Sequence, residues 1–261
     1  MGFKELCEHT DSEWSVFDTH QIDHLSPSSI NLFVEDIPLW IMTYLFKIRD
    51  NYGVGAVRGT VLEKYLHQHL TKNNVNVEHL LKEFNDSCDQ MNITKDEKYI
   101  KEQDQILRFY SNIKSNWSHQ EQEIKTYQEK VEVHFEDIPV PIHGYTDFVY
   151  EKAIVDLKTT FAVPSKLTEA VKRQMACYSM VYPEKEAVVS YYSPSKTVNH
   201  VLNDEELDYY KNQLGRICHS IQNFLSMSTD KYEIASKFFP NFSSWKWSDY
   251  MKNEAKQIWR V

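Results

Sequence analysis

Two aspartates and a lysine near the middle of the sequence, Asp147, Asp156 and Lys158, have the residue types and the spacing of a metal-dependent hydrolytic site. They fall in two short apolar runs, 144–150 and 153–159, that predict neighbouring strands. In a hairpin that turns between these runs, opposed positions sum to 303, so Asp147 faces Asp156 and Lys158 shares their face.

Opposed carboxylates of this kind require a cation. Directly opposed side chains have Cβ atoms only about 4.5–5.5 Å apart, and like charges there are destabilising. Because no paired His or Cys accompanies the aspartates, the oxygen ligands favour Mg²⁺ or Mn²⁺ over zinc. The alternative is a solvent-facing edge hairpin with scattered charges. Against that alternative, Phe148, Val155 and Leu157 on the other face need a core.

The same segment resembles a known signature. Asp147 followed by Asp156-Leu157-Lys158 is similar to the PD-(D/E)xK motif, in the form found in RecB-like nucleases and their phage relatives. The family follows its lysine with a helix that carries Gln-x-x-x-Tyr, and Gln174 and Tyr178 match that spacing. At i and i+4, these two side chains lie one turn apart on one helix face.

Two upstream segments extend the resemblance. Arg58-Gly59 with Glu63 four residues after the glycine fits the family's Arg-Gly-x-x-x-His/Glu helix. The opening Ser-x-Ser-x-Ile/Leu-x-x-Phe motif is matched by residues 26–33 and is followed by Pro38, with the next aromatic residue one place early. The four matches occur in the family's order between residues 26 and 178.

One departure from the family concerns cysteines. Some relatives hold an iron–sulfur cluster with a cysteine before the opening proline and a cysteine cluster near the C-terminus. Here isoleucine precedes the proline and residues 244–250 contain no cysteine, so a four-thiolate cluster is excluded. We expect Trp245, Trp247 and Tyr250 to pack against Trp40 and to stabilise this region instead; ordinary aromatic core is the alternative.

The resemblance implies roles for the motif residues. Asp147, Asp156, Glu63 and the backbone carbonyl of Leu157 would bind one or two Mg²⁺ or Mn²⁺ ions, with His67 as a weaker candidate ligand. The catalytic set comprises Glu63, Asp147, Asp156, Lys158, Gln174 and Tyr178. Lys158 would orient the attacking water and stabilise the transition state, and general-base action by the lysine is an open alternative.

Gln174 and Tyr178 would orient the site, support the lysine or contact the DNA backbone. Five basic residues near the motifs are candidates for contacts with DNA phosphates, which hold the strand without reading its sequence. For each of them, a solvated surface charge is the alternative. They are Arg58, Lys64, Lys166, Lys172 and Arg173.

Helices and four strands must position these residues. Helical patterns cover residues 26–46, Val57–Leu70, Val77–Met91, Asp96–Trp117, Pro164–Val181 and Glu205–Leu225, and strand patterns cover Thr126–Phe135, Gly144–Tyr150, Ala153–Thr159 and Ala187–Tyr192. In the first strand, alternation predicts Tyr127, Val131, Val133 and Phe135 on one face.

We therefore expect an α/β (α+β) fold with a mixed central sheet flanked by helices and with helical N- and C-terminal additions. The resemblance implies a restriction-endonuclease-like core. One domain would span residues 1–261, with a helical part over 1–120, the catalytic sheet over 121–202 and a second helical part over 203–261.

Composition and charge limit the classes of protein to which this chain can belong. The 261 residues are 41% hydrophobic, and the longest strongly apolar run is far shorter than the roughly 20 residues of a membrane span, so no membrane is expected as a partner. The N-terminus lacks a signal-peptide pattern and the 4 cysteines are dispersed, so we expect a reduced, cytoplasmic protein. A net charge of −9 disfavours non-specific coating of nucleic acid, but a local basic groove remains compatible with it.

The resulting hypothesis is a magnesium-dependent DNA exonuclease that acts in phage or bacterial replication, recombination or DNA degradation. Two alternatives stay open: a single-strand or flap endonuclease of the same superfamily, and an inactive nucleic-acid-binding subunit. DNA is the expected partner, and relatives leave open a homo-oligomer and a recombination partner protein.

Overall fold

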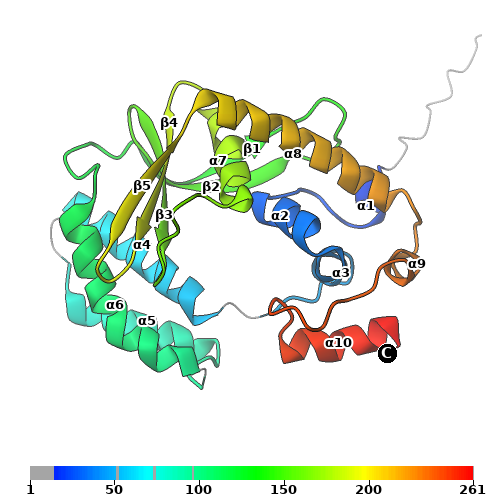
Figure 1. Ribbon diagram of the computed structural model, residues 1–261, viewed down its shortest axis with the longest axis horizontal. Helices are drawn as coiled ribbons and strands as arrows, with labels where there is room; N and C mark the ends of the chain where they lie inside the picture. Colours follow the sequence, from blue (N-terminus) through cyan, green and yellow to red (C-terminus); the bar gives the residue numbers. More distant parts are fainter. Residues whose placement is uncertain (1–14, 51–52, 73–74, 96, 261) are drawn as a thin grey trace, which may run out of the picture.

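A five-stranded mixed sheet forms the centre of the protein (Figure 1). The computed structural model describes residues 15–50, 53–72, 75–95 and 97–260. The strands lie in chain order: β1 (Thr126–Val133), β2 (Ile142–Val149), β3 (Ala153–Thr159), β4 (Glu186–Tyr192) and β5 (Thr197–Leu202). β3 and β4 are parallel, and the other neighbouring pairs are antiparallel.

Helices cover both faces of this sheet, so the predicted fold class is confirmed. The parallel pair β3–β4 requires a crossover, which α7 (Glu169–Val181) provides. On the α7 face, α8 (Asp204–Leu225) and α2 (Pro27–Glu35) pack against α7. The opposite face, which we call the α4 face, is covered by α4 (Val54–Lys72) and α6 (Glu97–Asn116), with α5 (Val77–Gln90) against both helices.

Burial on both faces explains the apolar runs of the central strands. Ile154 and Val189 belong to the core on the α7 face, whereas Val155 and Val188 belong to the core on the α4 face. Parallel strands covered on both sides read as near-continuous hydrophobic runs. The edge strand β5 has a mixed polar pattern, which explains why sequence periodicity did not predict it.

The predicted single face of β1 is wrong. Val131 and Val133 lie in the core on the α7 face, but Tyr127 packs against the core on the α4 face. Gln128 lies between them with a left-handed backbone, at φ 48°. One left-handed residue interrupts the alternation of side chains, so the two halves of the strand present opposite faces.

Short elements surround the sheet and its helices. They are α1 (Val16–Thr19), α3 (Ile37–Trp40), the π-helical turn η1 (Ile41–Leu45), α9 (Lys231–Ser236) and α10 (Asp249–Trp259). Ser26 caps the start of α2: its Oγ accepts from Ser29 N–H at 3.1 Å, and Pro27 is the first helical residue. Helix α10 lies within residues 203–261, which were expected to be helical, although no separate helix was predicted at its bounds.

The expected packing of Trp245, Trp247 and Tyr250 against Trp40 is wrong, and of the three only Trp247 is buried, in a separate core. Its ring is buried among residues of α3, η1 and α10, and its Nε1 donates to Asp36 Oδ2 at 2.9 Å. Trp245 and Tyr250 are 89% and 50% exposed, so their predicted burial is wrong. Trp40 packs instead against rings of α2, η1 and α8.

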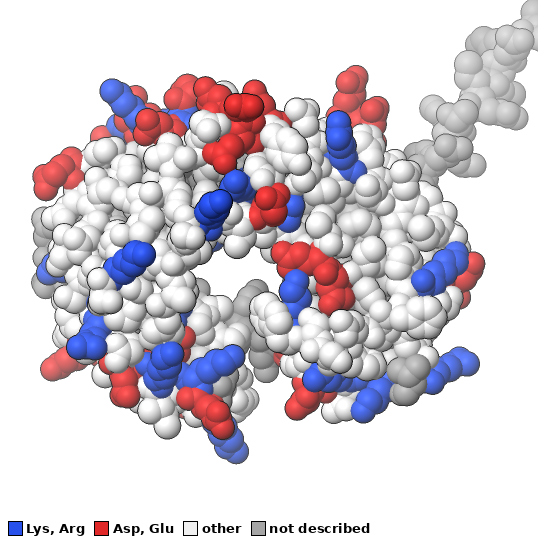
Figure 2. All heavy atoms as spheres, viewed as in Figure 1, with Lys and Arg blue, Asp and Glu red and all other residues white. Residues whose placement is uncertain are grey.

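The molecule is hollowed between its two helical sides. Figure 2 shows an opening in this view, between the side that carries α4–α6 and the side that carries α3 and α10 (Figure 1). Basic and acidic side chains are interspersed on the face shown. Among the described residues, no helix combines the length and the apolar character that a bilayer span requires.

Candidate active site

The β2–β3 hairpin has the predicted register but opens at the two aspartates. Phe148 pairs with Val155, and Val149 pairs with Ile154, so opposed positions sum to 303. The ladder ends before the Asp147–Asp156 position. Asp147 Oδ2 instead accepts from the backbone N–H of Leu157 at 2.7 Å. A carboxylate thus takes the place of a backbone acceptor at the point where the strands separate.

Asp156 and Lys158 form an ion pair inside the protein. Asp156 is only 1% exposed, and Lys158 Nζ lies 3.0 Å from Oδ1 and 2.9 Å from Oδ2. Only the contact with Oδ1 has hydrogen-bond geometry, so Oδ2 is buried without a hydrogen-bond donor among the described residues. A buried carboxylate oxygen without such a donor is normally costly, which marks this atom as an available ligand.

Helix α7 brings Gln174 and Tyr178 to the lysine. Lys158 Nζ donates to Gln174 Oε1 at 3.2 Å, and Gln174 Nε2 donates to the Tyr178 hydroxyl at 2.9 Å. Tyr178 is buried over Gly144 of β2, where an added Cβ would lie 2.7 Å from its Cε1 atom. Gly144 is therefore a site residue that motif matching missed, although a glycine inside a strand signals such a close approach.

Glu63 reaches the same site from α4. Gln128 Nε2 donates to Glu63 Oε1 at 3.0 Å. Burial raises the pKa of Glu63, and the negative charge of Asp156 raises that pKa further, against the lowering effect of the Gln128 bond. The structure therefore brings Glu63 close enough to Asp156 for the two charges to interact.

Arg58 fixes α4 against the end of β3. It forms a buried ion pair with Glu102, and its Nη2 donates to the Thr159 carbonyl at 2.9 Å. Its guanidinium also lies 4.5 Å from the ring centroid of Phe109. Because Arg58 is only 5% exposed, its predicted contact with DNA is wrong, and its contacts are those of a structural anchor.

The site has an excess of negative charge. Burial raises the pKa of Asp147 well above the ordinary range, and the charges of Asp156 and Glu63 act in the same direction. Burial alone would lower the pKa of Lys158, but the two aspartates outweigh burial and raise this pKa. One protonated lysine therefore faces three acidic groups.

The chemistry of the donors fits a hard divalent cation. The three acidic groups supply oxygen ligands, Asp156 Oδ2 lacks a hydrogen-bond donor, and the charge excess calls for a cation. The side chains do not already form a closed cage: among the described residues, no group of three or more His, Cys, Asp and Glu is arranged around a common metal position. Leu157 N–H, Lys158 and Gln128 hold the carboxylates in their present positions.

The remaining predicted DNA contacts divide into two groups. Arg173 is buried and donates to Asn31 Oδ1 and Gln213 Oε1, so its predicted contact with DNA is wrong. The lysines lie at the surface. Lys64 pairs with Glu83, Lys172 pairs with Glu206, and Lys166 is exposed in the loop between β3 and α7.

Aromatic residues complete the surroundings of the carboxylates and the lysine. His67 stacks on Tyr127, with ring centroids 3.8 Å apart and an interplanar angle of 3°. Burial and the nearby negative charge of Glu63 raise the pKa of the Tyr127 hydroxyl. Tyr191 pairs with Lys158 in the β3–β4 ladder and is buried beside it. Tyr127 and Tyr191 lie outside every motif, and only the assembled sheet identifies them.

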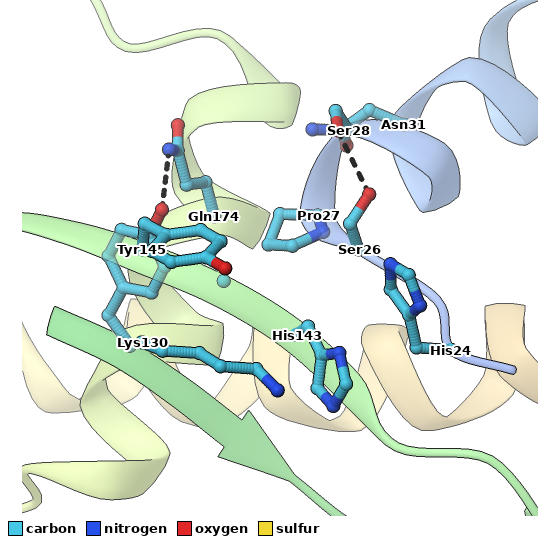
Figure 3. A pocket seen from close by; sticks show the side chains of 11 residues that line it. His24, Ser26, Pro27, Ser28, Asn31, Lys130, His143, Tyr145 and Gln174 are labelled. Atoms are coloured by element: carbon cyan, nitrogen blue, oxygen red, sulfur yellow. Dashed lines mark hydrogen bonds between the residues drawn. The ribbon is translucent and has the colours of Figure 1, made fainter. Parts of the chain in front are cut away.

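A cavity of about 490 Å³ adjoins Gln174 and Tyr178 (Figure 3). Residues of α2, β1 and β2 and the segment before α2 form the rest of its lining. The rings of His24 and His143 stack there with centroids 4.6 Å apart, and Lys130 is also part of the wall. The cavity volume lies within the range typical of small-ligand sites.

Comparisons with known proteins support the fold. No protein-family profile matches the chain, and no curated protein matches its sequence. A solved structure described as a "putative exonuclease" from Eubacterium rectale superimposes with a TM-score of 0.57 at 12% identity, over 97% of this chain and 94% of that chain. The structure of SSO0001 gives a TM-score of only 0.34 at 17% identity, over 71% and 97% of the chains. The first of these superpositions shows that the protein shares the fold of the Eubacterium rectale structure.

Proposed function

We propose that the protein is a divalent-metal-dependent DNA nuclease of the PD-(D/E)xK type, in the RecB-like and phage exonuclease branch without an iron–sulfur cluster. The observation that carries this proposal is the meeting of Glu63, the Asp147–Asp156 pair, Lys158 and Gln174 at the opened end of one hairpin. Three separate segments, α4, the β2–β3 hairpin and α7, contribute to it.

Each acidic group has a part in holding the metal. Asp147, Asp156, Glu63 and the Leu157 carbonyl would hold one or two Mg²⁺ or Mn²⁺ ions. A bound ion of this kind lowers the pKa of water and neutralises charge on a phosphate. Without that ion, Lys158 alone would offset the charges of three acidic groups. Binding of the metal would therefore neutralise the excess negative charge of the site.

Lys158 acts as a cation in this proposal. Its raised pKa keeps it protonated at neutral pH, which favours stabilisation of negative charge on the phosphate over general-base action. Gln174 holds the ammonium group in place and Tyr178 holds Gln174, so α7 sets the direction in which the lysine points.

The cavity beside Gln174 supports exonuclease action. A pocket with Lys130, two histidines and serine hydroxyls has groups that can bind a phosphate, and its volume suits a single terminal nucleotide better than a continuing duplex. The exonuclease description of the Eubacterium rectale relative agrees with this choice. An internal cut would not need such a pocket.

The test uses linear duplex DNA labelled at the 5′ or 3′ end and circular single-stranded DNA, each with Mg²⁺, Mn²⁺ or EDTA. We expect mononucleotide release from linear ends that EDTA and Lys158→Ala abolish. The matched control, Lys152→Ala, changes an exposed lysine at the turn of the same hairpin and should retain activity. Cleavage of circles would identify an endonuclease, and metal-independent binding without hydrolysis would identify a binding subunit.

A further inference from the structure

Gln128 has an unusual backbone for a strand residue. Its φ is 48°, and the other left-handed non-glycine residues of the described chain (Gln21, Lys47, Asn92 and Arg260) all lie outside the strands. This region is unfavourable for a residue with a Cβ, and glutamine lacks the short side chain that makes Asn and Asp tolerant of it. Such a conformation persists only where its surroundings hold it, and it is frequent at functional sites.

The unusual residue lies opposite Asp147. Tyr127 pairs with Phe148 and Glu129 pairs with Thr146, so the register places Gln128 across from Asp147, but the ladder omits this position. On the other side of β2, the ladder with β3 also ends before Asp147. Asp147 therefore has no ladder partner in either neighbouring strand, β1 or β3.

The side chain of Gln128 has a second effect. It is exposed, so it contributes little to packing, but its Nε2 donates to Glu63 Oε1 at 3.0 Å. This bond joins β1 to α4 and fixes one oxygen of Glu63. One residue therefore restrains Glu63 through its side chain and frees the segment of Asp147 through its backbone.

We propose that Gln128 is a positioning residue of the metal site. The proposal rests on the proposed function in one respect, namely that Glu63 and Asp147 hold the metal. Hydrogen bonds from outside the ligand set fix the orientation of ligands, and their loss typically weakens metal affinity about 10–100-fold. Gln128 does not touch the reacting phosphate in this proposal, so its loss should affect the metal and not the affinity for DNA.

The experiment compares Gln128→Ala, Gln128→Gly and the control Gln122→Ala, which removes an exposed glutamine from the turn before β1. Three quantities are measured: the Mn²⁺ dissociation constant by calorimetry on EDTA-treated protein, the Mg²⁺ concentration for half-maximal cleavage, and the KM for DNA. We expect both Gln128 variants to raise the two metal values at least about 10-fold while KM stays within about twofold. The control should match the wild type.

Melting temperature separates the backbone from the side chain. Gln128→Gly relieves the left-handed strain that Gln128→Ala retains, so the glycine variant should melt about 2 °C or more above the alanine variant although both bind metal weakly. Unchanged Mn²⁺ affinity in both variants would overturn the proposal, as would a wild type that binds no Mn²⁺ at millimolar concentration. Weakened Mn²⁺ binding in variants of a wild type that cuts no DNA would support the positioning role and reject the nuclease.

Discussion

The two ends of the β2–β3 hairpin belong to the same strands, but the strands are paired at the turn and separate at the other end. At the turn, two ladder pairs are regular, Tyr150 N–H donates to the Ala153 carbonyl at 2.8 Å, and the buried Trp117 Nε1 donates to the Tyr150 hydroxyl at 2.9 Å. At the other end, Asp147 and Asp156 face each other without a ladder pair.

This difference separates stability from chemistry within about ten residues. Apolar burial and satisfied hydrogen bonds at the turn stabilise the fold. Carboxylates of like charge at the open end destabilise it and keep acidic oxygens available for a ligand. Active sites commonly reduce stability in this way, and the regular end of the hairpin compensates for it.

The largest expected effect is on activity at the open end. Asp156→Asn keeps the shape of the side chain but removes its charge, so cleavage should fall by about 10³-fold or more, because a metal ligand and the partner of Lys158 are lost together. Single-turnover rates on labelled duplex measure the effect. Asp208→Asn, at an exposed aspartate of α8, is the control. Retained activity in Asp156→Asn would remove this residue from the site.

The largest expected effect on stability concerns the anchor of α4. Arg58→Ala should lower the free energy of unfolding by about 3–5 kcal/mol, because it leaves Glu102 buried without its partner. Denaturant titration measures the loss, and the exposed Arg108→Ala should change it little. A stable Arg58→Ala protein with weakened DNA binding would restore the discarded role of Arg58 as a DNA contact.

A pair of glycine substitutions tests the packing of the site. Gly144→Ala places a methyl group 2.7 Å from Tyr178, so we expect a loss of about 1–3 kcal/mol and a roughly tenfold fall in cleavage as the tyrosine moves. Gly59→Ala in α4 meets its nearest neighbour, Thr159 Oγ1, at 3.7 Å and should stabilise the helix by up to about 1 kcal/mol. Equal behaviour of the two variants would contradict this account of Gly144.

At the turn end, Tyr150→Phe should cost stability but leave the chemistry intact. The substitution leaves the buried indole N–H of Trp117 without its acceptor, at a cost of about 1–3 kcal/mol. Thermal unfolding measures the cost, and the cleavage rate with saturating Mg²⁺ should match the wild type. A comparable loss of activity would show that the two ends of the hairpin are coupled.

The smallest effect concerns pH. The raised pKa of Asp147 means that the folded state binds a proton more tightly than the unfolded chain, so the metal-free protein should lose stability as pH rises above the ordinary aspartate range. Asp147→Asn should remove this dependence and stabilise the metal-free protein by about 1 kcal/mol at pH 7. The free energy of unfolding of both proteins is measured in EDTA from pH 4 to pH 8. If it varies with pH in the same way for the wild type and Asp147→Asn, the raised pKa of Asp147 is rejected.

Local pattern was enough to predict the central strands and the hairpin register. Ile154 and Val155 alternate between two cores, and a turn between Glu151 and Lys152 left one register in which the apolar side chains are buried. Strand β5 was missed because its pattern is mixed. Residues 203–261 were expected to be helical, but the burial of α10 depends on distant partners in α3 and η1. The face reversal in β1 was missed because it depends on the backbone of Gln128, which no periodicity reveals.

Sequence by itself determined which residues are available for chemistry and which of them are neighbours in the chain: Asp156 and Lys158 on one strand, and Gln174 and Tyr178 on one helix. These relations follow from periods of two and of 3.6 residues, which are local properties of the backbone. Tertiary structure decided which charged side chains are accessible to a ligand. Arg58 and Arg173 are arginines in the sequence like any others, but burial against Glu102, Asn31 and Gln213 gives them structural partners. Only packing between segments far apart in the chain sets such burial, and burial determines whether a charge can meet a ligand.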